Sequence, residues 1–364
     1  MVIGQNFIAG SRSAQGNKLL QSFNATTGEA LAYEFHQATE QEVNQACEAA
    51  SQAFKSYRHT SPEQRALFLE AIADELDALG EDFLNIISQE TALPLARLQG
   101  ERGRTSGQMR LFAKVLRRGD FLGARIDTAL PDRKPMPRVD LRQIKIGVGP
   151  IAVFGASNFP LAFSTAGGDT SSALAAGCPV VVKAHSGHMA TADQVAQAIE
   201  RAVEKTNMPK GVFNMVYGNG VGETLVKHPL IQAVGFTGSL KGGRALCDMA
   251  AARPQPIPVF AEMSSINPML MLPAALKSRG SQIAQDLADS VVMGCGQFCT
   301  NPGLILGIKS PEYTQLIVQL TEIMNAKTAQ TMLNAGTLKS YVSGLEHLTK
   351  HQGIEHLAGQ AQQG

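Results

Sequence analysis

The chain has 364 residues and a formal net charge of +1, with 44% hydrophobic and 17% charged residues. This length is sufficient for two domains, and the charge argues against nucleic acid or an acidic membrane surface as the main partner. No apolar run approaches the roughly 18 residues that a membrane-spanning helix needs. The N-terminus shows no secretory signal pattern, so a cytoplasmic protein is the default expectation.

The N-terminal part of the chain is predicted to contain small strands followed by helices. Residues 1–35 hold short turn-rich segments, which indicate strands. Apolar residues recur at helical spacing over 39–89, and another helix is predicted over 93–116. Residues 117–143 are rich in Arg, Pro and Asp, and we expect them to form an exposed excursion.

From Ile144 onward, apolar β-branched runs alternate with helical stretches. The predicted segments are 151–154, 161–176, 180–183, 191–205, 212–216, 221–227, 233–236, 240–251 and 257–260. A second alternating region follows Asn267, with segments 269–272, 283–292, 304–309 and 313–332. This alternation indicates βαβ units around a buried parallel sheet. We therefore predict an α/β fold with two domains, 1–265 and 266–364.

The first candidate site residue is Asn158, which follows the predicted 151–154 strand. Ligands of open parallel sheets bind beyond the carboxyl ends of the strands, and an asparagine there can donate N–H groups to an oxyanion. A helix N-cap is the competing explanation, because asparagine favours that position.

Two further strand ends carry groups that suit a nucleotide. Lys183 closes the 180–183 strand, where its ammonium can bind a hydroxyl or phosphate, although a surface lysine would look the same. No acid stands near it to hold a ribose 2′-hydroxyl, only His185, Ser186 and His188. The run 236–243 offers a tight turn, a hydroxyl and a helix N-terminus, which favour an anion. It lacks the G-x-G-x-x-G fingerprint, and an ordinary turn remains the alternative.

Glu262 and Cys299 are the candidate base and nucleophile. Glu262 follows the apolar run 257–260, and apolar surroundings make a carboxylate a better general base. An exposed strand-end glutamate is the alternative. Cys299 lies in Gly-Gln-Phe-Cys-Thr, and cysteine is nucleophilic as its thiolate. A half-buried structural cysteine is the competing interpretation.

The number and spacing of the cysteines favour a reducing compartment and argue against a metal site. The five cysteines are Cys47, Cys178, Cys247, Cys295 and Cys299. This odd number at distant positions does not suit a disulfide framework. Cys295 and Cys299 are close, but no second pair or neighbouring histidine completes a four-ligand set, so we expect no metal site.

Taken in chain order, these motifs resemble those of the aldehyde dehydrogenase superfamily. They are Asn158 in Asn-Phe-Pro, Lys183 after Val-Val-Val, Phe-Thr-Gly-Ser, Glu262, and Gly-Gln-Phe-Cys. Nearly the whole chain takes part, because residues 24–29 also look like the N-terminal turn of that family. The resemblance implies a Rossmann-like NAD(P)-binding domain over 1–265 and an α/β catalytic domain over 266–364.

The resemblance also implies a mechanism. The Cys299 thiolate attacks the aldehyde carbonyl, and the Asn158 side chain and the Cys299 backbone N–H hold the oxyanion. Hydride passes to the nicotinamide and leaves a thioester, which water activated by Glu262 hydrolyses to the carboxylic acid.

Within the family, the runs 155–164, 166–170 and 183–185 look most like the branch that oxidises α-ketoglutaric semialdehyde (2,5-dioxovalerate) to 2-oxoglutarate. The relatives of that branch include NADP-preferring fatty aldehyde dehydrogenases. Ser186 stands where NAD-selective members carry a ribose-binding glutamate, so the resemblance implies NADP, with NAD as the other possibility. The implied cofactor contacts are Lys183, His185, Ser186, Phe236, Gly238 and Ser239.

Two departures from the family pattern stand out. Glu-Met-Ser-Ser-Ile at 262–266 replaces the usual Glu-Leu-Gly-Gly-Lys. The chain ends soon after Cys299, without the second glutamate motif, E-x-F-G-P, and without the C-terminal strand that pairs with a partner subunit. By resemblance we expect an N-terminal fragment that lacks full activity, whose full-length form is a homo-oligomer.

The substrate and the reaction leave alternatives open. Arg104 is the candidate for the distal carboxylate of a semialdehyde, whereas Phe159, Phe163 and Phe298 would line a tunnel for a long apolar aldehyde. A solvated helix arginine is the plain alternative for Arg104. A second possible function is that of a CoA-acylating semialdehyde dehydrogenase, although that branch typically lacks a base equivalent to Glu262. A catalytically idle interaction or structural protein on the same fold is the third.

Overall fold

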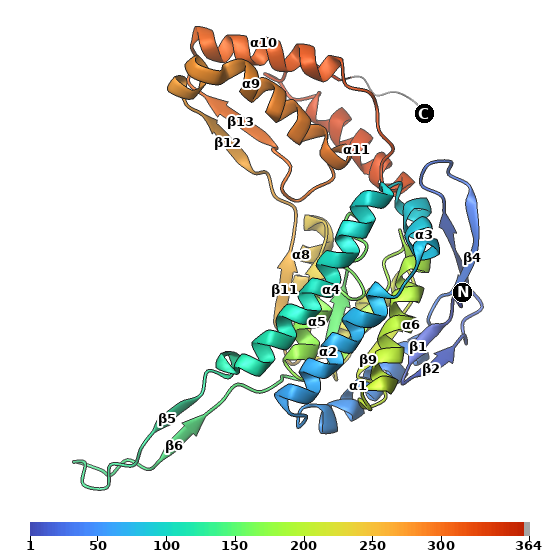
Figure 1. Cartoon of the computed structure of the whole chain (residues 1–364), viewed down its shortest axis with the longest axis vertical. Helices are drawn as coiled ribbons and strands as arrows, with labels where there is room; N and C mark the ends of the chain where they lie inside the picture. Colours follow the sequence, from blue (N-terminus) through green and yellow to red (C-terminus); the bar gives the residue numbers. More distant parts are fainter. Residues whose placement is uncertain (360–364) are drawn as a thin grey trace. The chain divides into compact units, whose positions relative to one another are not determined.

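A computed structural model describes residues 1–359 of the chain (Figure 1). The chain divides into two compact units. The first unit comprises Met1–Ser22, Ala30–Ser88 and Pro94–Met263. The second comprises Phe23–Glu29, Gln89–Leu93 and the described residues from Ser264 onward. The assignment of a cofactor domain before residue 265 and a catalytic domain after it stays a prediction.

A seven-stranded sheet forms the centre of the first unit, in the order β11-β10-β7-β8-β9-β1-β2. The five parallel strands are β7 (Ile151–Phe154), β8 (Val180–Lys183), β9 (Phe213–Val216), β10 (Ala233–Thr237) and β11 (Val259–Glu262). The antiparallel edge consists of β1 (Asn6–Ile8) and β2 (Ser11–Ser13). The predicted α/β class with a parallel sheet is therefore confirmed.

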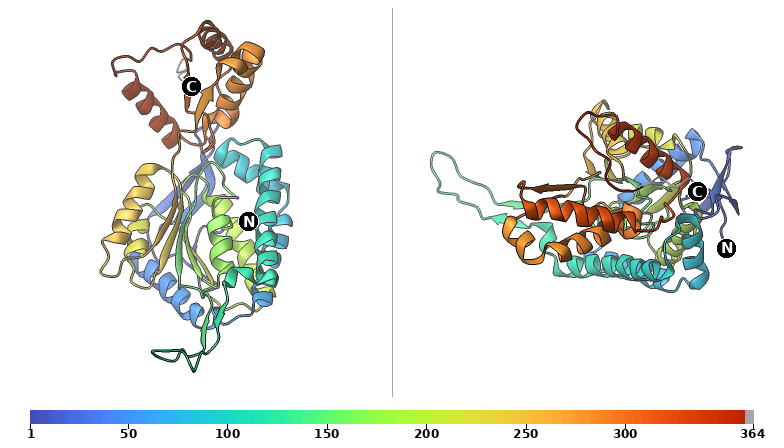
Figure 2. Two further views of the ribbon diagram at one scale, coloured as in Figure 1. Left: turned by 90° about the vertical axis from the view of Figure 1, so that its left-hand side faces the viewer. Right: turned by 90° about the horizontal axis from the view of Figure 1, so that it is seen from above.

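Helices cover both faces of this sheet (Figure 2). One face carries α1 (Glu40–Tyr57), α7 (Val221–Lys227) and α8 (Leu240–Ala251). The other carries α2 (Pro62–Asp77), α4 (Leu95–Arg118), α5 (Gly168–Ala175) and α6 (Met189–Lys205), while α3 (Glu81–Thr91) joins α2 to α4. With helices on both sides, all residues of β7 and β9 and most of those of β8 and β10 are buried, as their apolar sequences require.

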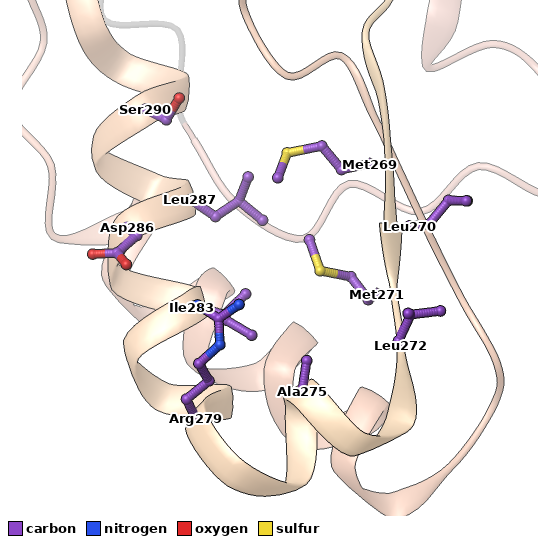
Figure 3. Close-up of a pocket in the computed structure, with 10 residues that line it drawn as sticks. All are labelled: Met269, Leu270, Met271, Leu272, Ala275, Arg279, Ile283, Asp286, Leu287 and Ser290. Carbon is purple, nitrogen blue, oxygen red and sulfur yellow. The ribbon is translucent and has the colours of Figure 1, made fainter.

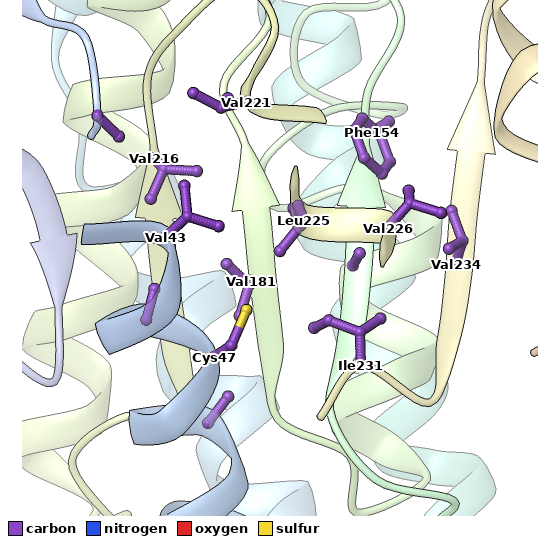
Figure 4. Close-up of a cluster of buried hydrophobic side chains, with 14 of the residues drawn as sticks. Val43, Cys47, Phe154, Val181, Val216, Val221, Leu225, Val226, Ile231 and Val234 are labelled. Atoms are coloured by element: carbon purple, nitrogen blue, oxygen red, sulfur yellow. The ribbon is translucent and has the colours of Figure 1, made fainter. Parts of the chain in front are cut away.

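The core between the sheet and α1, α7 and α8 is built from branched side chains (Figure 4). Val43 and Cys47 come from α1, Leu225 comes from α7, and Val181 and Phe154 come from the strands. All of them are buried. Buried β-branched residues pack well on a pleated surface, so this core holds α1 and α7 against the parallel strands.

Two antiparallel pairs complete the first part of the chain. The strands β3 (Leu19–Phe23) and β4 (Ala30–His36) form one pair. The strands β5 (Arg125–Asp127) and β6 (Leu141–Gln143) form a hairpin that extends away from the sheet (Figure 1). Ile126, Ile144 and Ile146 on this hairpin are between 59% and 64% exposed. An apolar surface of this kind is typical of a segment that contacts another protein surface.

The second unit has its own small sheet and core. The parallel strands β12 (Pro268–Met271) and β13 (Leu304–Gly307) pair along their length. The helices are α9 (Pro273–Val292), α10 (Pro311–Asn325) and α11 (Ala335–Leu348). A cavity of about 370 Å³ lies between β12 and α9, with Met269, Met271 and Leu287 pointing into it (Figure 3).

Three predicted helices have different bounds in the structure. The segment predicted over 161–176 forms a helix only from Gly168, because the backbone N–H groups of Leu161 and Ala162 donate to the Glu101 carboxylate and not to a helical turn. The helices predicted over 283–292 and 313–332 begin earlier, at Pro273 and Pro311. Proline is favoured in a first turn because its missing N–H is not needed there.

Candidate functional site

The register of the parallel strands places several predicted residues along one edge of the first unit. Phe154, the last residue of β7, is opposite both Lys183 of β8 and Phe236 of β10. Thr237 of β10 is opposite Glu262 of β11. This is the carboxyl edge, where open α/β sheets bind ligands.

Asn158 lies in the loop between β7 and α5. It is half-buried, and its backbone oxygen accepts a hydrogen bond of 2.5 Å from Nη2 of Arg97. The competing explanation of Asn158 as a helix cap is wrong, because Gly167 is the residue that caps α5. Asn158 therefore belongs to a loop at the sheet edge, and its role as an oxyanion donor stays a prediction.

Glu101 of α4 binds the same loop further along. Its Oε1 accepts hydrogen bonds from the backbone N–H groups of Leu161 at 2.8 Å and Ala162 at 3.0 Å. Its side chain is 3% exposed, and Oε2 lies 4.0 Å from Nη2 of Arg97. Burial raises the pKa of Glu101, against the opposing effect of these hydrogen bonds and of Arg97.

Arg104 and two of the three predicted aromatic residues lie together. The guanidinium of Arg104 lies over the rings of Phe159 and Phe163, with centroid distances of 5.5 and 4.9 Å. The two rings pack edge to face, 5.2 Å apart. The guanidinium of Arg97 also lies over the Phe159 ring, 5.0 Å from its centroid. A cation held over aromatic faces in this way keeps its N–H groups available to an anion.

Arg97 and Glu101 were not predicted from the sequence. The available signal was their spacing, because residues i, i+4 and i+7 lie on one side of a helix. Arg97, Glu101 and Arg104 have this spacing within the 24 residues of α4.

Lys183 and two histidines form a polar group beyond β8. Burial lowers the pKa of Lys183, and no carboxylate of the described residues offsets this effect. The rings of His185 and His188 stack at 5.0 Å, and Nε2 of His188 donates to the Ala156 carbonyl at 3.0 Å. Burial lowers the pKa of His188 to about 4 and that of His185 well below its ordinary value. Both rings are therefore neutral near pH 7, and Ser186 beside them is exposed.

The predicted turn after β10 leads into a helix N-terminus. Ser239 caps α8, and its Oγ accepts from the Gly242 N–H at 3.2 Å. The Phe236 ring covers the turn so closely that a Cβ on Gly238 would lie 2.7 Å from it. Gly238 also donates to the Glu262 carbonyl at 3.0 Å. Hydrogen bonds therefore connect the turn at Gly238 with the end of β11, directly before the Ser239 cap of α8.

Glu262 ends β11 at the edge of the sheet, and its side chain is exposed. This differs from the apolar surroundings expected from the sequence, because β11 is an edge strand whose residues alternate between half-buried and exposed. The backbone oxygen of Glu262 is fixed by Gly238, while its carboxylate faces water.

Cys299 and Phe298 belong to the second unit, whereas the other predicted site residues belong to the first. Cys299 is exposed. Its backbone oxygen accepts hydrogen bonds from the Ser265 hydroxyl and, at 2.7 Å, from Nδ2 of Asn267. Neither partner was predicted from the sequence, although Ser265 belongs to the departure from the family motif at 262–266. They fix the peptide that follows the candidate nucleophile.

The turn before Cys299 has a left-handed backbone. Gly294, Cys295 and Gly296 have φ angles of 58°, 59° and 69°. Glycine adopts this conformation freely, whereas cysteine is strained in it. Cys295 is held there by hydrogen bonds to Gln330.

Two kinds of feature are absent from residues 1–359. No helix there is long and apolar enough to cross a membrane. No group of three or more His, Cys, Asp or Glu side chains is placed to hold a metal ion.

Comparison with known proteins places these observations in a family. Residues 11–340 match the model described as the aldehyde dehydrogenase family. An α-ketoglutaric semialdehyde dehydrogenase of Acinetobacter baylyi is 60% identical over 98% of this chain and 68% of its own length. A second one, from Azospirillum brasilense, is 52% identical over the whole chain and 69% of its own length. The crystal structure of an NAD-dependent benzaldehyde dehydrogenase from Corynebacterium glutamicum has the same fold, with a TM-score of 0.81, 20% identity, and coverage of 99% of this chain and 77% of that one.

Proposed function

The chain belongs to the aldehyde dehydrogenase family of NAD(P)-using oxidoreductases, and we propose that it oxidises α-ketoglutaric semialdehyde to 2-oxoglutarate. The observation that carries this proposal is the 60% identity with the Acinetobacter baylyi enzyme, which extends over 98% of the chain. The geometry of the Asn158 loop and of the Arg104 cluster supports it.

The proposed chemistry begins at Cys299. Its thiolate adds to the aldehyde carbon, and the carbonyl oxygen becomes an oxyanion. The Asn158 side chain and the Cys299 N–H donate to that oxygen, where preorganised donors stabilise the transition state most. Support comes from hydrogen bonds to the backbone of each residue. Arg97 donates to the Asn158 carbonyl, and Asn267 donates to the Cys299 carbonyl.

Glu262 is the proposed general base for the second half of the reaction. After the hydride has left the substrate carbon, Cys299 carries a thioester. Glu262 takes a proton from water, which attacks the acyl carbon and releases the carboxylate and the Cys299 thiolate. The exposure of the Glu262 carboxylate is compatible with this role, because the water must reach it.

The residues at the carboxyl edge fit a nicotinamide dinucleotide, which when bound accepts the hydride. Lys183 offers a half-buried ammonium that no described carboxylate neutralises, which suits ribose hydroxyls or a phosphate. The helix start at Ser239, with Phe236 and Gly238 shaping the turn, suits a diphosphate. His185 would lie beside the sugar as a neutral ring.

NADP is the preferred cofactor in this proposal. The exposed, neutral Ser186 leaves room for a 2′-phosphate, whereas a carboxylate there would repel it. The neutral state of His185 and His188 adds no charge of either sign. Lys183 supplies the positive charge next to this position.

The Arg104 cluster favours a semialdehyde over a long apolar aldehyde. A tunnel for an alkyl chain would need Phe159 and Phe163 to face each other without a charge, but Arg104 lies over both rings. A guanidinium with available N–H groups binds a carboxylate in two-point fashion. Phe298 remains a proposed apolar contact from the second unit.

We also propose that the protein self-associates through the β5–β6 hairpin. Its exposed apolar residues Ile126, Ile144 and Ile146 form a surface that a second copy of the chain would cover.

The direct test is an assay of the purified chain with α-ketoglutaric semialdehyde and NADP. The proposal expects one NADPH and one 2-oxoglutarate per aldehyde consumed, without any need for CoA. The turnover rate in the same assay tests the expectation, stated above, that the chain lacks full activity. A strict requirement for CoA would support the acylating alternative. No turnover with any aldehyde, together with Cys299 alkylation no faster than that of Cys247, would support the idle alternative.

A further inference from the structure

We infer that Glu101, assisted by Arg97, is a positioning residue that holds the Asn158 loop in the geometry needed for oxyanion stabilisation. The inference rests on the proposed function, in which Asn158 is the oxyanion donor. Neither α4 residue contacts the reacting atoms in this assignment, so each acts through the loop.

The first observation is a pair of hydrogen bonds from one carboxylate oxygen to consecutive peptides. Oε1 of Glu101 accepts from Leu161 at 2.8 Å and from Ala162 at 3.0 Å. These residues are only three and four positions after Asn158. A buried carboxylate that accepts two backbone N–H groups makes strong, charge-assisted hydrogen bonds, and it fixes the orientation of both peptides.

The second observation is that Arg97 binds the other end of the same short segment. Its Nη2 donates to the Asn158 backbone oxygen at 2.5 Å and lies 4.0 Å from Oε2 of Glu101. The loop is therefore held at residue 158 by a cation and at residues 161 and 162 by an anion. Both come from one helix turn, since Arg97 and Glu101 are four residues apart.

The third observation is that α4 is itself fixed. It packs along α2 and against α5, and the Glu101 backbone oxygen accepts from Thr105 Oγ1 at 2.8 Å. A rigid helix that binds a loop at three backbone atoms defines the position of the loop. Catalysis is sensitive to such placement, because a displacement of about 1 Å at a reacting group can cost about a hundredfold in rate.

The test compares Glu101→Ala and Glu101→Gln in the full chain with Glu42→Ala as a matched control. Glu42 is also a buried carboxylate, and it also accepts backbone N–H groups, from Gln15 at 3.0 Å and Thr39 at 2.9 Å. It fixes the N-terminal strands and not the Asn158 loop. All three variants are measured for thermal unfolding, for kcat and KM, and for hydrogen exchange of the peptide that covers residues 158–163.

We expect Glu101→Ala to exchange faster at Leu161 and Ala162 and to lose about 10- to 100-fold in kcat, with a much smaller change in KM. Glu101→Gln keeps an oxygen that accepts both N–H groups, so it retains most of the activity and the protection. Glu42→Ala loses stability but keeps its kcat. A fall in kcat of the same size in Glu42→Ala would overturn the inference, because general destabilisation would then explain the loss.

A double-mutant cycle with Asn158→Ala separates positioning from other roles. If Glu101 acts through Asn158, its replacement costs little further kcat once Asn158 is alanine. If the double variant instead shows a loss in kcat equal to the product of the two single losses, the inference is overturned. If Glu101→Ala does not fold, Arg97→Met replaces it in the cycle, since Arg97 is half-exposed.

The exchange measurement keeps this inference separate from the proposed function. An inactive wild-type chain would refute the function, and faster exchange in Glu101→Ala would then still show that Glu101 holds the loop. Unchanged exchange at residues 158–163 would overturn the inference whatever the activity.

Discussion

The guanidinium of Arg104 lies over the ring of Phe163, 4.9 Å from its centroid, so that a charge and an aromatic face share one candidate substrate site. We predict that Arg104→Met raises the KM for α-ketoglutaric semialdehyde about tenfold or more, because a charge-assisted hydrogen bond to the distal carboxylate is lost. The KM for decanal should not rise. Steady-state kinetics with both aldehydes checks this.

Arg110→Met is the matched control on the same helix, since Arg110 pairs with Asp74 and Asp77. It should leave both KM values unchanged. An unchanged KM for the semialdehyde in Arg104→Met would refute the role of Arg104.

Replacement of the nucleophile should abolish turnover. We predict that Cys299→Ser lowers kcat by about a thousandfold or more, since removal of a covalent nucleophile is among the most damaging changes to an enzyme. Iodoacetamide at neutral pH should label Cys299 first, because it is exposed. Burial raises the pKa of Cys47 to about 12, so that thiol should stay unlabelled in the folded protein. Peptide mass spectrometry identifies the labelled residue, and Cys247→Ser serves as the active control.

The cofactor preference should depend on Ser186. We predict that Ser186→Glu weakens the binding of NADP by about a hundredfold, because a carboxylate next to a 2′-phosphate costs several kcal/mol of binding free energy. NAD should be affected little or used better. Ser186→Gln introduces the same bulk without the charge and should keep the NADP preference. The ratio of kcat/KM for the two cofactors is the measurement, and a wild-type chain that strongly prefers NAD would contradict the assignment.

Acid should destabilise the fold through His188. Burial lowers its pKa to about 4, below the ordinary value of 6.5, so the unfolded chain binds more protons between these two values. The neutral form therefore contributes stability that is fully present above about pH 6.5 and is lost as the pH falls toward 4. The half-buried His185, whose pKa is also lowered, acts in the same direction.

A shift of this size corresponds to a few kcal/mol, on the order of 3. Urea unfolding at pH 7 and pH 5 should show a smaller loss for His188→Gln than for the wild type. The exposed His59→Gln should behave like the wild type. Equal losses in all three would exclude His188 as the source.

Self-association should depend on the hairpin. We predict that the double change Ile144→Ser and Ile146→Ser lowers the mass measured by light scattering to that of one chain, because the apolar contact area is lost. Leu67→Ser, which changes an exposed leucine on α2, is the control. A wild-type mass equal to one chain at all concentrations would contradict self-association through this surface.

Much of the fold could be predicted because its signals are local. The strands β7, β8 and β10 are mostly apolar, and glycine follows β7 and β10 directly. The helix expected over 161–176 shows the limit of such signals. Leu161, Ala162 and Phe163 have suitable side chains for a helix, but their backbone is held by Glu101 and by Ala156, which donates to the Phe163 carbonyl. These partners are far away in sequence, so no local pattern reveals them.

The site residues also divide into those with a local sequence signal and those whose role depends on contacts that are distant in sequence. Lys183, Ser239 and Glu262 lie at strand ends, which a sequence marks clearly. Arg97 and Glu101 read as charged residues of a solvated helix, because a single sequence does not show that α4 turns this side toward a loop. For Glu262 the sequence left an apolar and an exposed setting open, since the position of β11 at the edge of the sheet depends on the order of all seven strands.

The hydrogen bonds to the Cys299 carbonyl have a mechanical consequence. Ser265 and Asn267, which make them, stand directly after Met263, where the chain passes from the first unit to the second. The connecting segment and the turn of the nucleophile are thus fastened to each other. These hydrogen bonds couple the backbone conformation of residues 265–267 to that of the Cys299 peptide.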